Sequence, residues 1–275
     1  QRQMCIRDRV AAGRLSSSEP NLQNIPTMTA YGKEIRAAFV PKQGHLFVSA
    51  DYSQIELRVL AYLSQDPALL RAFAQNRDIH AETAARLFDV SPEQVTPEQR
   101  NMGKRINFSV LYGMTPFGLS QDLGIPFGQA KDYIDKYFAG YPRVMEWMEQ
   151  VIVDTKHKGY VTTLAGRRRY VPAIYEKNRS LYEEARRVAI NTVAQGTAAE
   201  IMKKGMITLN ALFKEKSLGA QIILQIHDEL VVSVPEQELQ IAEKVIIDTL
   251  EKVVDWNVPL VVNTRAGKNW KEITK

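Results

Sequence analysis

The sequence predicts an α+β fold in which an antiparallel sheet with packed helices carries an inserted, mainly helical part. A β-type run, His45 to Asp51, lies near the start of the chain. A strand–turn–strand pattern, Gln221 to Val234, and a last short strand, Leu260 to Thr264, lie near its end. The residues between follow a helical pattern. Strands at both ends with helices between indicate one sheet domain with a helical insertion.

Local signals set the remaining elements in order. The segment Gly13 to Pro41 is rich in Ser, Asn, Pro and Thr and is expected to be mostly loop. A basic hairpin is expected over 160–171 and a long helix over about 180–216, in which Gly196 is a candidate for an interruption. Apolar periodicity predicts the other helices over 54–63, 68–73, 79–88, from Thr96 onward, 130–138, 143–158 and 236–253.

Composition narrows the class of protein. The 275 residues are 45% hydrophobic and 24% charged, an ordinary globular profile, and the formal charge of +5 suits a polyanionic partner. No stretch approaches the roughly 18 apolar residues of a membrane helix, and no secretory signal is visible. We therefore expect no membrane partner. The single cysteine, Cys5, excludes an internal disulfide and a cysteine-based zinc site.

The first nine residues, QRQMCIRDR, have no periodicity and no evident structural role. Met4 to Asp8 match the translation of a transposase adapter used in sequencing libraries. We predict that residues 1–9 are an adapter or cloning scar outside the fold. The codons of the source DNA decide this, since any series other than ATG-TGT-ATA-AGA-GAC over those five residues refutes it.

Two acids carry the first chemical signal. Asp51 ends an apolar strand, and Asp228 lies between two apolar runs where His227-Asp228 makes a two-residue hairpin turn. Carboxylates beside core residues are costly unless they are paired or bind metal. If the two strands are neighbours, both carboxylates reach one edge of the sheet and can hold two divalent cations about 3.5–4 Å apart. The structural alternative is an N-cap for Asp51 and a turn residue for Asp228.

The helix after Thr96 carries the second signal. Thr96 to Gln99 form a capping box with proline at the first helical position, and Gly113 suits the C-terminal stop. Arg100, Lys104 and Phe108 recur at a spacing of four, on one face. The two cations can hold a triphosphate while the aromatic ring packs on a base or sugar. The alternative is a solvated basic face with Phe108 in the core.

A second stripe lies on the later long helix. Arg187, Asn191 and Gln195 are again spaced by four, on a segment made largely of Val, Ala and Ile. Such groups suit a partner with many acceptors, and the DNA minor groove offers purine N3 and pyrimidine O2 at every base pair. The alternative is a helix face that points to water.

Three long motifs then resemble the DNA polymerases of family A, the bacterial DNA polymerase I family. DYSQIELR (51–58) resembles motif A, RNMGKRINFSVLYG (100–113) resembles motif B, and QIHDELV (225–231) resembles motif C. GRLSSSEPNLQNIP (13–26) and VAQGTAAEIMK (193–203) also fit that family. The similarity runs from about residue 10 to the end, with the motifs in the family's order.

The resemblance implies a two-metal nucleotidyl transfer in which the primer 3′-hydroxyl attacks the α-phosphate of a deoxynucleoside triphosphate. Asp51, Asp228 and the Tyr52 carbonyl would bind two Mg²⁺ ions, with Glu229 supporting the site. Lys104 would also donate a proton to the leaving pyrophosphate. The nucleotide site that the resemblance implies comprises the phosphate-holding, stacking and sugar-selecting residues Gln54, Glu56, His80, Arg100, Lys104, Phe108 and Tyr112.

Within that site Phe108 would stack on the incoming nucleotide, and Glu56 with Tyr112 would exclude a 2′-hydroxyl. The resemblance also implies contacts to the minor groove of primer-template DNA from Arg14, Arg187, Asn191, Gln195 and His227. The implied partners are primer-template DNA and a dNTP. The implied state is a monomer in the bacterial cytoplasm, associated with the nucleoid.

By the same resemblance, residues 10–57 would be the first part of a palm, 58–176 the fingers and 177–275 the second part of the palm. Family members carry a thumb and further domains upstream of Gly13, which this sequence lacks, so we expect weak or absent activity from the chain alone. Two alternatives stay open. A single-subunit, phage-type RNA polymerase shares the palm acids and the Arg/Lys/Tyr helix, although Glu56 and Phe108 argue against it. A non-catalytic DNA-binding module is the other alternative.

Overall fold

The computed structural model describes residues 11, 13–27 and 29–274. The predicted scar and Cys5 therefore lie outside the described residues. The chain divides into two compact units, one made of residues up to 55, 198–255 and 260 onward, the other of 56–197 and 256–259. The first holds a four-stranded antiparallel sheet, and the second is helical with one two-stranded hairpin. The predicted α+β class is confirmed; the assignment of palm and fingers to residue ranges stays a prediction.

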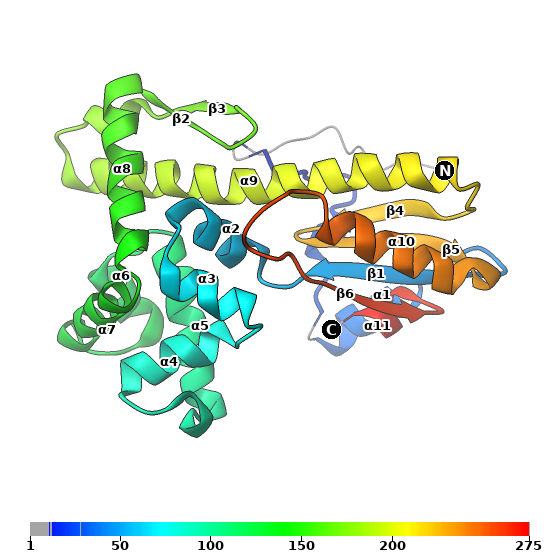
Figure 1. Ribbon diagram of the computed structural model, residues 1–275, viewed down its shortest axis with the longest axis horizontal. Coiled ribbons are helices and arrows are strands. Elements are labelled where there is room, and N and C mark those ends of the chain that lie inside the picture. The colour runs from blue at the N-terminus through cyan, green and yellow to red at the C-terminus, as the bar shows by residue number, and fades with distance from the viewer. Residues whose placement is uncertain (1–10, 12, 28, 275) are drawn as a thin grey trace. The chain divides into compact units, whose positions relative to one another are not determined.

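The sheet unit contains four strands in the order β4-β5-β1-β6, with every neighbouring pair antiparallel. The turn between β4 and β5 is His227–Asp228, and His227 adopts a φ of 49°, so the predicted two-residue hairpin turn is confirmed. The elements of this unit are α1 (Ala30–Ala37), β1 (His45–Tyr52), the end of α9 (Arg179–Glu215), β4 (Gln221–Ile226), β5 (Glu229–Pro235), α10 (Leu239–Glu251), β6 (Val262–Gly267) and α11 (Trp270–Ile273) (Figure 1).

Alternation along β1 separates the two faces of this sheet. Phe47 packs with α11, and the Ser49 hydroxyl donates to the Ile273 carbonyl at 3.2 Å. Tyr52 points to the other face, where its hydroxyl donates to the Leu250 carbonyl of α10 at 2.8 Å. Since side chains alternate with a period of two, Asp51 lies on the α11 face at the end of the strand. The Asp51 carboxylate therefore lies at the edge of the sheet where β1 ends.

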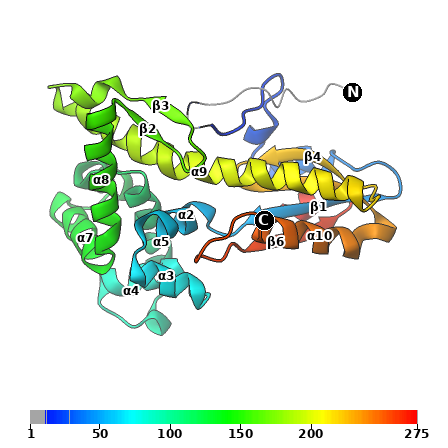
Figure 2. The same cartoon turned by 45° about the horizontal axis from the view of Figure 1, so that its top comes forward.

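The helical unit is built on one apolar core. Its elements are α2 (Ile55–Ser64), α3 (Pro67–Ala74), α4 (Ile79–Phe88), α5 (Pro97–Leu111), α6 (Pro116–Leu123), α7 (Phe127–Gly140), α8 (Pro142–Lys158), β2 (Tyr160–Thr162), β3 (Arg168–Tyr170) and the start of α9. The β2–β3 hairpin lies along α9 in both views (Figures 1 and 2), where Arg169 donates to the Thr192 hydroxyl at 3.0 Å. No helix among the described residues is long and apolar enough to cross a membrane.

Two expectations about the elements were wrong, and two short helices were not predicted. The long helix α9 is continuous, because residues 192–194 and 196–198 are buried and their packing offsets the roughly 1 kcal/mol that Gly196 costs. Residues 30–37, expected to be loop, form α1, capped by Thr29. The short helices α6 and α11 were not predicted, because the four residues of α11 are too few to show a helical repeat and Pro116 and Gly118 at the start of α6 are turn signals.

Gly103 marks the closest approach of α4 and α5. A Cβ there would lie 2.3 Å from the His80 carbonyl oxygen and 3.0 Å from the Ala84 amide nitrogen, both of them backbone atoms. Gly103→Ala is therefore expected to lower the free energy of unfolding by about 1–3 kcal/mol, measured by urea titration. The matched control is Gly128→Ala on α7, where nothing lies within 4 Å and the same change should stabilise by about 0.5–1 kcal/mol. Equal shifts in both variants would contradict the close approach.

Candidate functional site

The two predicted acids lie at one edge of the sheet. Asp51 is directly opposite Glu229 in the β1–β5 ladder, and the Tyr52 amide donates to the Asp228 carbonyl oxygen at 3.1 Å. Asp51, Asp228 and Glu229 all line one cavity of about 540 Å³. Antiparallel pairing of β1 with the β4–β5 hairpin thus brings together residues separated by more than 170 positions in sequence. Their metal-binding role stays a prediction.

Burial shapes the charge state of this edge. It raises the pKa of the Asp228 carboxyl, an effect opposed by the positive charges of Arg14 and His227. It also raises the pKa of Glu229, an effect opposed by the positive charges of Arg36 and Arg265. Both raised pKa values mean that the ionised carboxylates lack full solvation. A cation bound here would favour the ionised forms.

The donor set at this edge fits a hard cation. Among the described residues no group of three or more His, Cys, Asp or Glu side chains is placed to hold a metal ion by itself. Two carboxylates and the Tyr52 carbonyl supply oxygen donors. Mg²⁺ prefers oxygen and is usually held by one or two carboxylates, with water and substrate phosphates completing its shell. The residues therefore fit Mg²⁺ that binds together with a phosphate substrate.

The second group of predicted residues lies on α5 in the helical unit. Thr96 and Gln99 form the predicted capping box. The helix ends in a Schellman motif, with Gly113 donating to the Val110 carbonyl and Met114 to that of Ser109. These caps fix both ends of the helix that carries the basic stripe.

The two cations of the stripe on α5, Arg100 and Lys104, differ in their surroundings. Arg100 donates through Nε to Asp78 at 2.5 Å, whereas Lys104 is exposed. Lys104, Phe108 and Tyr112 line one open cavity of about 500 Å³. A cation and two rings therefore share one accessible surface, as the spacing of four predicts.

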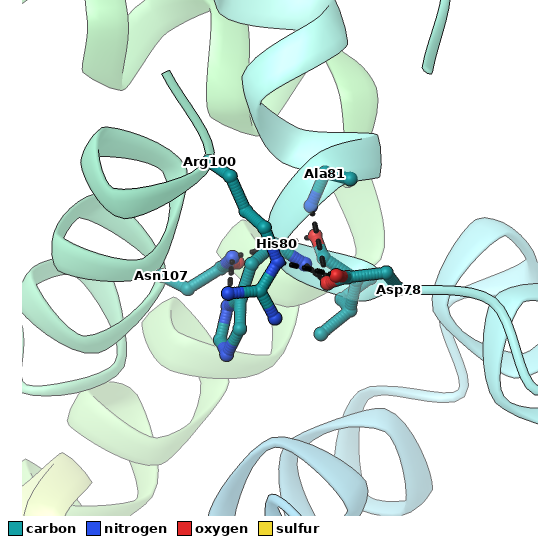
Figure 3. A network of polar contacts seen from close by, with 6 residues as sticks. Asp78, His80, Ala81, Arg100 and Asn107 are labelled. Atoms are coloured by element: carbon teal, nitrogen blue, oxygen red, sulfur yellow. Dashed lines mark hydrogen bonds and ion pairs between the residues drawn. The ribbon is translucent and has the colours of Figure 1, made fainter. Parts of the chain in front are cut away.

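His80 lies in the first turn of α4 and is 3% exposed (Figure 3). Burial lowers the pKa of its imidazole to about 4; the charges of Arg100 and Lys104 lower it further and Asp78 opposes them. The ring is therefore neutral at pH 7. Its Nδ1 lies 3.1 Å from Asn107 Nδ2.

Glu56 and Gln54 flank the start of α2. Glu56 is 4% exposed and accepts a hydrogen bond from the Tyr112 hydroxyl at 2.8 Å, which ties the start of α2 to the end of α5. Gln54 adopts a left-handed conformation, φ 54°, in the turn that follows β1. A non-glycine residue in this region is strained and is found often at functional sites.

The predicted DNA-binding residues fall in both units. Arg187, Asn191 and Gln195 are half-buried on α9, and Asn191 Oδ1 is buried with no hydrogen-bond donor among the described residues. Arg14 and His227 belong to the sheet unit, where both act on the Asp228 carboxylate. Their role toward DNA stays a prediction.

Three residues beside the predicted ones were given no role of their own from the sequence. Asp78 caps α4, accepting from the amides of His80 and Ala81, and also holds Arg100 (Figure 3). The sequence does indicate this cap, because an aspartate directly before a predicted helix is a preferred N-cap residue. Asn107 contacts His80. Arg36 donates to the Ile25 and Pro26 carbonyls beside the acidic edge, at 2.7 and 3.3 Å, and no local pattern identifies it.

Comparisons with known proteins show the family of this chain. A family model described as DNA polymerase family A matches residues 5–272. The chain is 48% identical over 262 residues to "DNA polymerase I, thermostable" of Thermus filiformis, covering 95% of this chain and 31% of that protein. It is 47% identical to DNA polymerase I of Pseudomonas aeruginosa, covering 95% of this chain and 29% of that protein. The chain thus spans about 30% of the length of these relatives.

Among solved structures, the POL domain of Pol1 from M. smegmatis, in complex with DNA primer-template and dNTP, aligns with a TM-score of 0.92. The sequences are 39% identical, and the alignment covers 97% of this chain and 47% of that one. At this identity the likeness extends to sequence as well as fold.

Proposed function

This chain belongs to DNA polymerase family A, and on that premise we propose that it carries the nucleotidyl-transfer site of a template-directed DNA polymerase. Its substrates would be a dNTP and the 3′-hydroxyl of a primer on a DNA template, as bound in the M. smegmatis relative. The observation that carries the proposal is the meeting of Asp51 and Asp228 at one sheet edge. Phosphoryl transfer needs little covalent participation by the protein, so positioning and charge supply the rate.

Two Mg²⁺ ions would be held by Asp51, Asp228 and the Tyr52 carbonyl, and when bound they would activate the primer hydroxyl and offset charge on the leaving pyrophosphate. Glu229 supports this edge from the opposite position of the ladder, beside Asp51. These partly buried carboxylates would keep their ionised form for this task because a cation would replace the solvent that they lack.

The groups on α4 and α5 would hold the triphosphate of the nucleotide. Arg100 supplies a planar donor that suits phosphate oxygens, and Asp78 orients it. Lys104 supplies a mobile ammonium group that can also donate a proton to the leaving pyrophosphate. His80 adds a neutral N–H donor, and Gln54 completes the phosphate contacts.

Sugar and base would be selected at the other end of the α5 stripe. Phe108 stacks on the incoming nucleotide, and Tyr112 occupies the neighbouring position. The Glu56–Tyr112 hydrogen bond places a buried carboxylate where a 2′-hydroxyl would find no room. Arg14, Arg187, Asn191, Gln195 and His227 would follow the minor groove of the primer-template.

The test is addition of one nucleotide to a primer-template with Mg²⁺, with the chain in excess over DNA so that weak DNA binding does not limit the rate. The proposal predicts addition only of the base complementary to the template, and a dNTP in preference to the matching rNTP. Efficient rNTP addition would favour the phage-type RNA polymerase. DNA binding with no addition at any concentration would favour the non-catalytic module.

Glu56→Ala in the same assay is expected to raise the relative efficiency of rNTP addition by about 10- to 100-fold, because removing a steric barrier of this size is worth one to three kcal/mol. The matched control is Glu146→Ala on α8, whose exposed carboxylate pairs with Arg143 at 2.7 Å. Discrimination between dNTP and rNTP that survives Glu56→Ala would exclude Glu56 as the sugar selector.

A further inference from the structure

We propose that Asn107 is a positioning residue that fixes His80 as the imidazole tautomer protonated on Nε2, and so presents that N–H as an uncharged donor to a phosphate group. The identity of the phosphate as part of the bound triphosphate rests on the proposed function. The tautomer itself rests on side-chain geometry alone. Asn107 is fully buried on α5, and His80 is 3% exposed on α4.

The amide of Asn107 can be oriented in only one way. Its Oδ1 accepts from the Thr83 hydroxyl at 3.1 Å, and its Nδ2 lies 3.5 Å from the Ile79 carbonyl oxygen. A carbonyl oxygen can only accept, so the amide nitrogen must face Ile79. That nitrogen also faces His80 Nδ1 at 3.1 Å. An amide nitrogen donates and has no lone pair to offer, so Nδ1 must be the unprotonated acceptor.

Thr83 holds this orientation from the far side. Its hydroxyl is buried and lies 3.4 Å from the hydroxyl of Tyr141. A Tyr141 hydroxyl that donates to Thr83 leaves Thr83 free to donate to Asn107. A flipped amide would place Oδ1 against the Ile79 carbonyl oxygen, so that two acceptors would face each other. With Tyr141 as the donor in its contact with Thr83, one chain of hydrogen bonds runs from Tyr141 through Thr83 and Asn107 to His80.

In the resulting tautomer the proton lies on Nε2, which is on the opposite side of the ring from Asn107 (Figure 3). Among the described residues no hydrogen bond to Nε2 is made. A protonated imidazole would need a second N–H at Nδ1, directed at the donor of Asn107, so the same contact that selects the tautomer opposes protonation.

Charged groups on two helices influence whether the His80 imidazole is neutral or protonated. Asp78 on the α4 side favours the imidazolium, while Arg100 and Lys104 on α5 disfavour it, and burial disfavours it most. A neutral donor between two cations can approach phosphate without adding charge repulsion among the protein groups. Asn107 thus converts a titratable side chain into a constant donor across the neutral pH range.

The test uses ¹⁵N-labelled chain and correlates the imidazole nitrogens with their ring protons at pH 5 to 8. The chain has four histidines, so His80 is assigned by comparison with His80→Gln. The expected result is one bare nitrogen at Nδ1 and one protonated nitrogen at Nε2 over the whole range. A proton on Nδ1, or titration of His80 near its ordinary pKa, overturns the proposal without any further variant.

Asn107→Asp reverses the contact, because a carboxylate accepts where the amide donated. We expect the titration of His80 to move from about pH 4 to above its ordinary value and Nδ1 to become protonated. Asn101→Asp, an exposed change of the same charge on the same helix, controls for electrostatics and should leave the tautomer as it was. A His80 spectrum unchanged in Asn107→Asp overturns the proposal.

Binding of dATP by His80 variants distinguishes a failure of this proposal from a failure of the proposed function. His80→Phe keeps a ring but removes the Nε2 donor, and it should weaken binding of dATP by about 10-fold, with partial recovery in His80→Gln. The Nε2–H tautomer with unchanged dATP affinity in His80→Phe would refute presentation of that N–H to the nucleotide and leave the role of Asn107 intact. The wrong tautomer with normal dATP affinity would overturn Asn107 and leave the polymerase proposal intact.

Discussion

Asp228→Asn is expected to lower the rate of single-nucleotide addition by about 10³-fold, because loss of a metal-binding carboxylate removes several kcal/mol of transition-state stabilisation. The replacement has the same shape, so the sheet edge should keep its structure. Stability should move in the opposite direction. Burial raises the pKa of Asp228 in the folded chain, so above its unfolded pKa the ionised group costs stability. Removing the charge should therefore raise the free energy of unfolding at pH 7.

The two readouts together identify the role of Asp228. The rate is measured by quenched addition with the chain in excess over primer-template, and stability by urea unfolding without metal. The matched control is Asp248→Asn on α10, an exposed carboxylate paired with Lys252 at 2.8 Å, which should change neither by much. A structural turn residue would give the opposite pattern, with stability lost and the rate per folded molecule preserved.

Lys104→Met is expected to lower the efficiency of dNTP addition by about 100-fold. The change keeps the aliphatic stem and removes the ammonium group, which we propose both binds the triphosphate and donates a proton to the leaving pyrophosphate. General acid catalysis typically contributes about 10²- to 10⁴-fold, and the expected loss lies at the lower end of that range. Since part of the effect arises only in the transition state, the maximal rate should fall in addition to the dNTP affinity.

Arg105→Met is the matched control for Lys104, one residue along α5. Arg105 is also exposed, and it pairs with Asp122 at 3.0 Å. The maximal rate and the half-saturating dNTP concentration are measured for both variants at several pH values. A loss in Arg105→Met equal to that in Lys104→Met would assign the effect to the net charge of α5 and exclude a specific role for Lys104.

Local signals in the sequence were enough for the elements that carry the site. The apolar run of β1, the two-residue turn at His227–Asp228 and the capping box at Thr96 each depend on residues within a few positions of one another, and each is confirmed. The interruption expected at Gly196 was wrong because a local signal was outweighed by tertiary packing. The cost of Gly196 is local, whereas the burial that offsets it is tertiary.

The network around His80 marks the limit of prediction from sequence. Asp78 and Arg100 are 22 residues apart, and Thr83 and Asn107 are 24 apart, so no periodicity joins them. Only the packing of α4 on α5, which Gly103 permits, brings these groups into hydrogen-bond distance. The family resemblance, now confirmed by the match over residues 5–272, predicted a role for His80 but not for Asn107, which we propose fixes its tautomer.

The central claim is that Asp51 and Asp228 act as one unit on shared cations, and the most direct measurement is a double-mutant cycle. Rates of single-nucleotide addition are compared for the chain, Asp51→Asn, Asp228→Asn and the double variant, at saturating Mg²⁺. Residues that act as a unit are strongly non-additive, so the double variant should be no slower than the slower single one. Losses that multiply in the double variant would show that the two carboxylates work independently and would contradict the shared site.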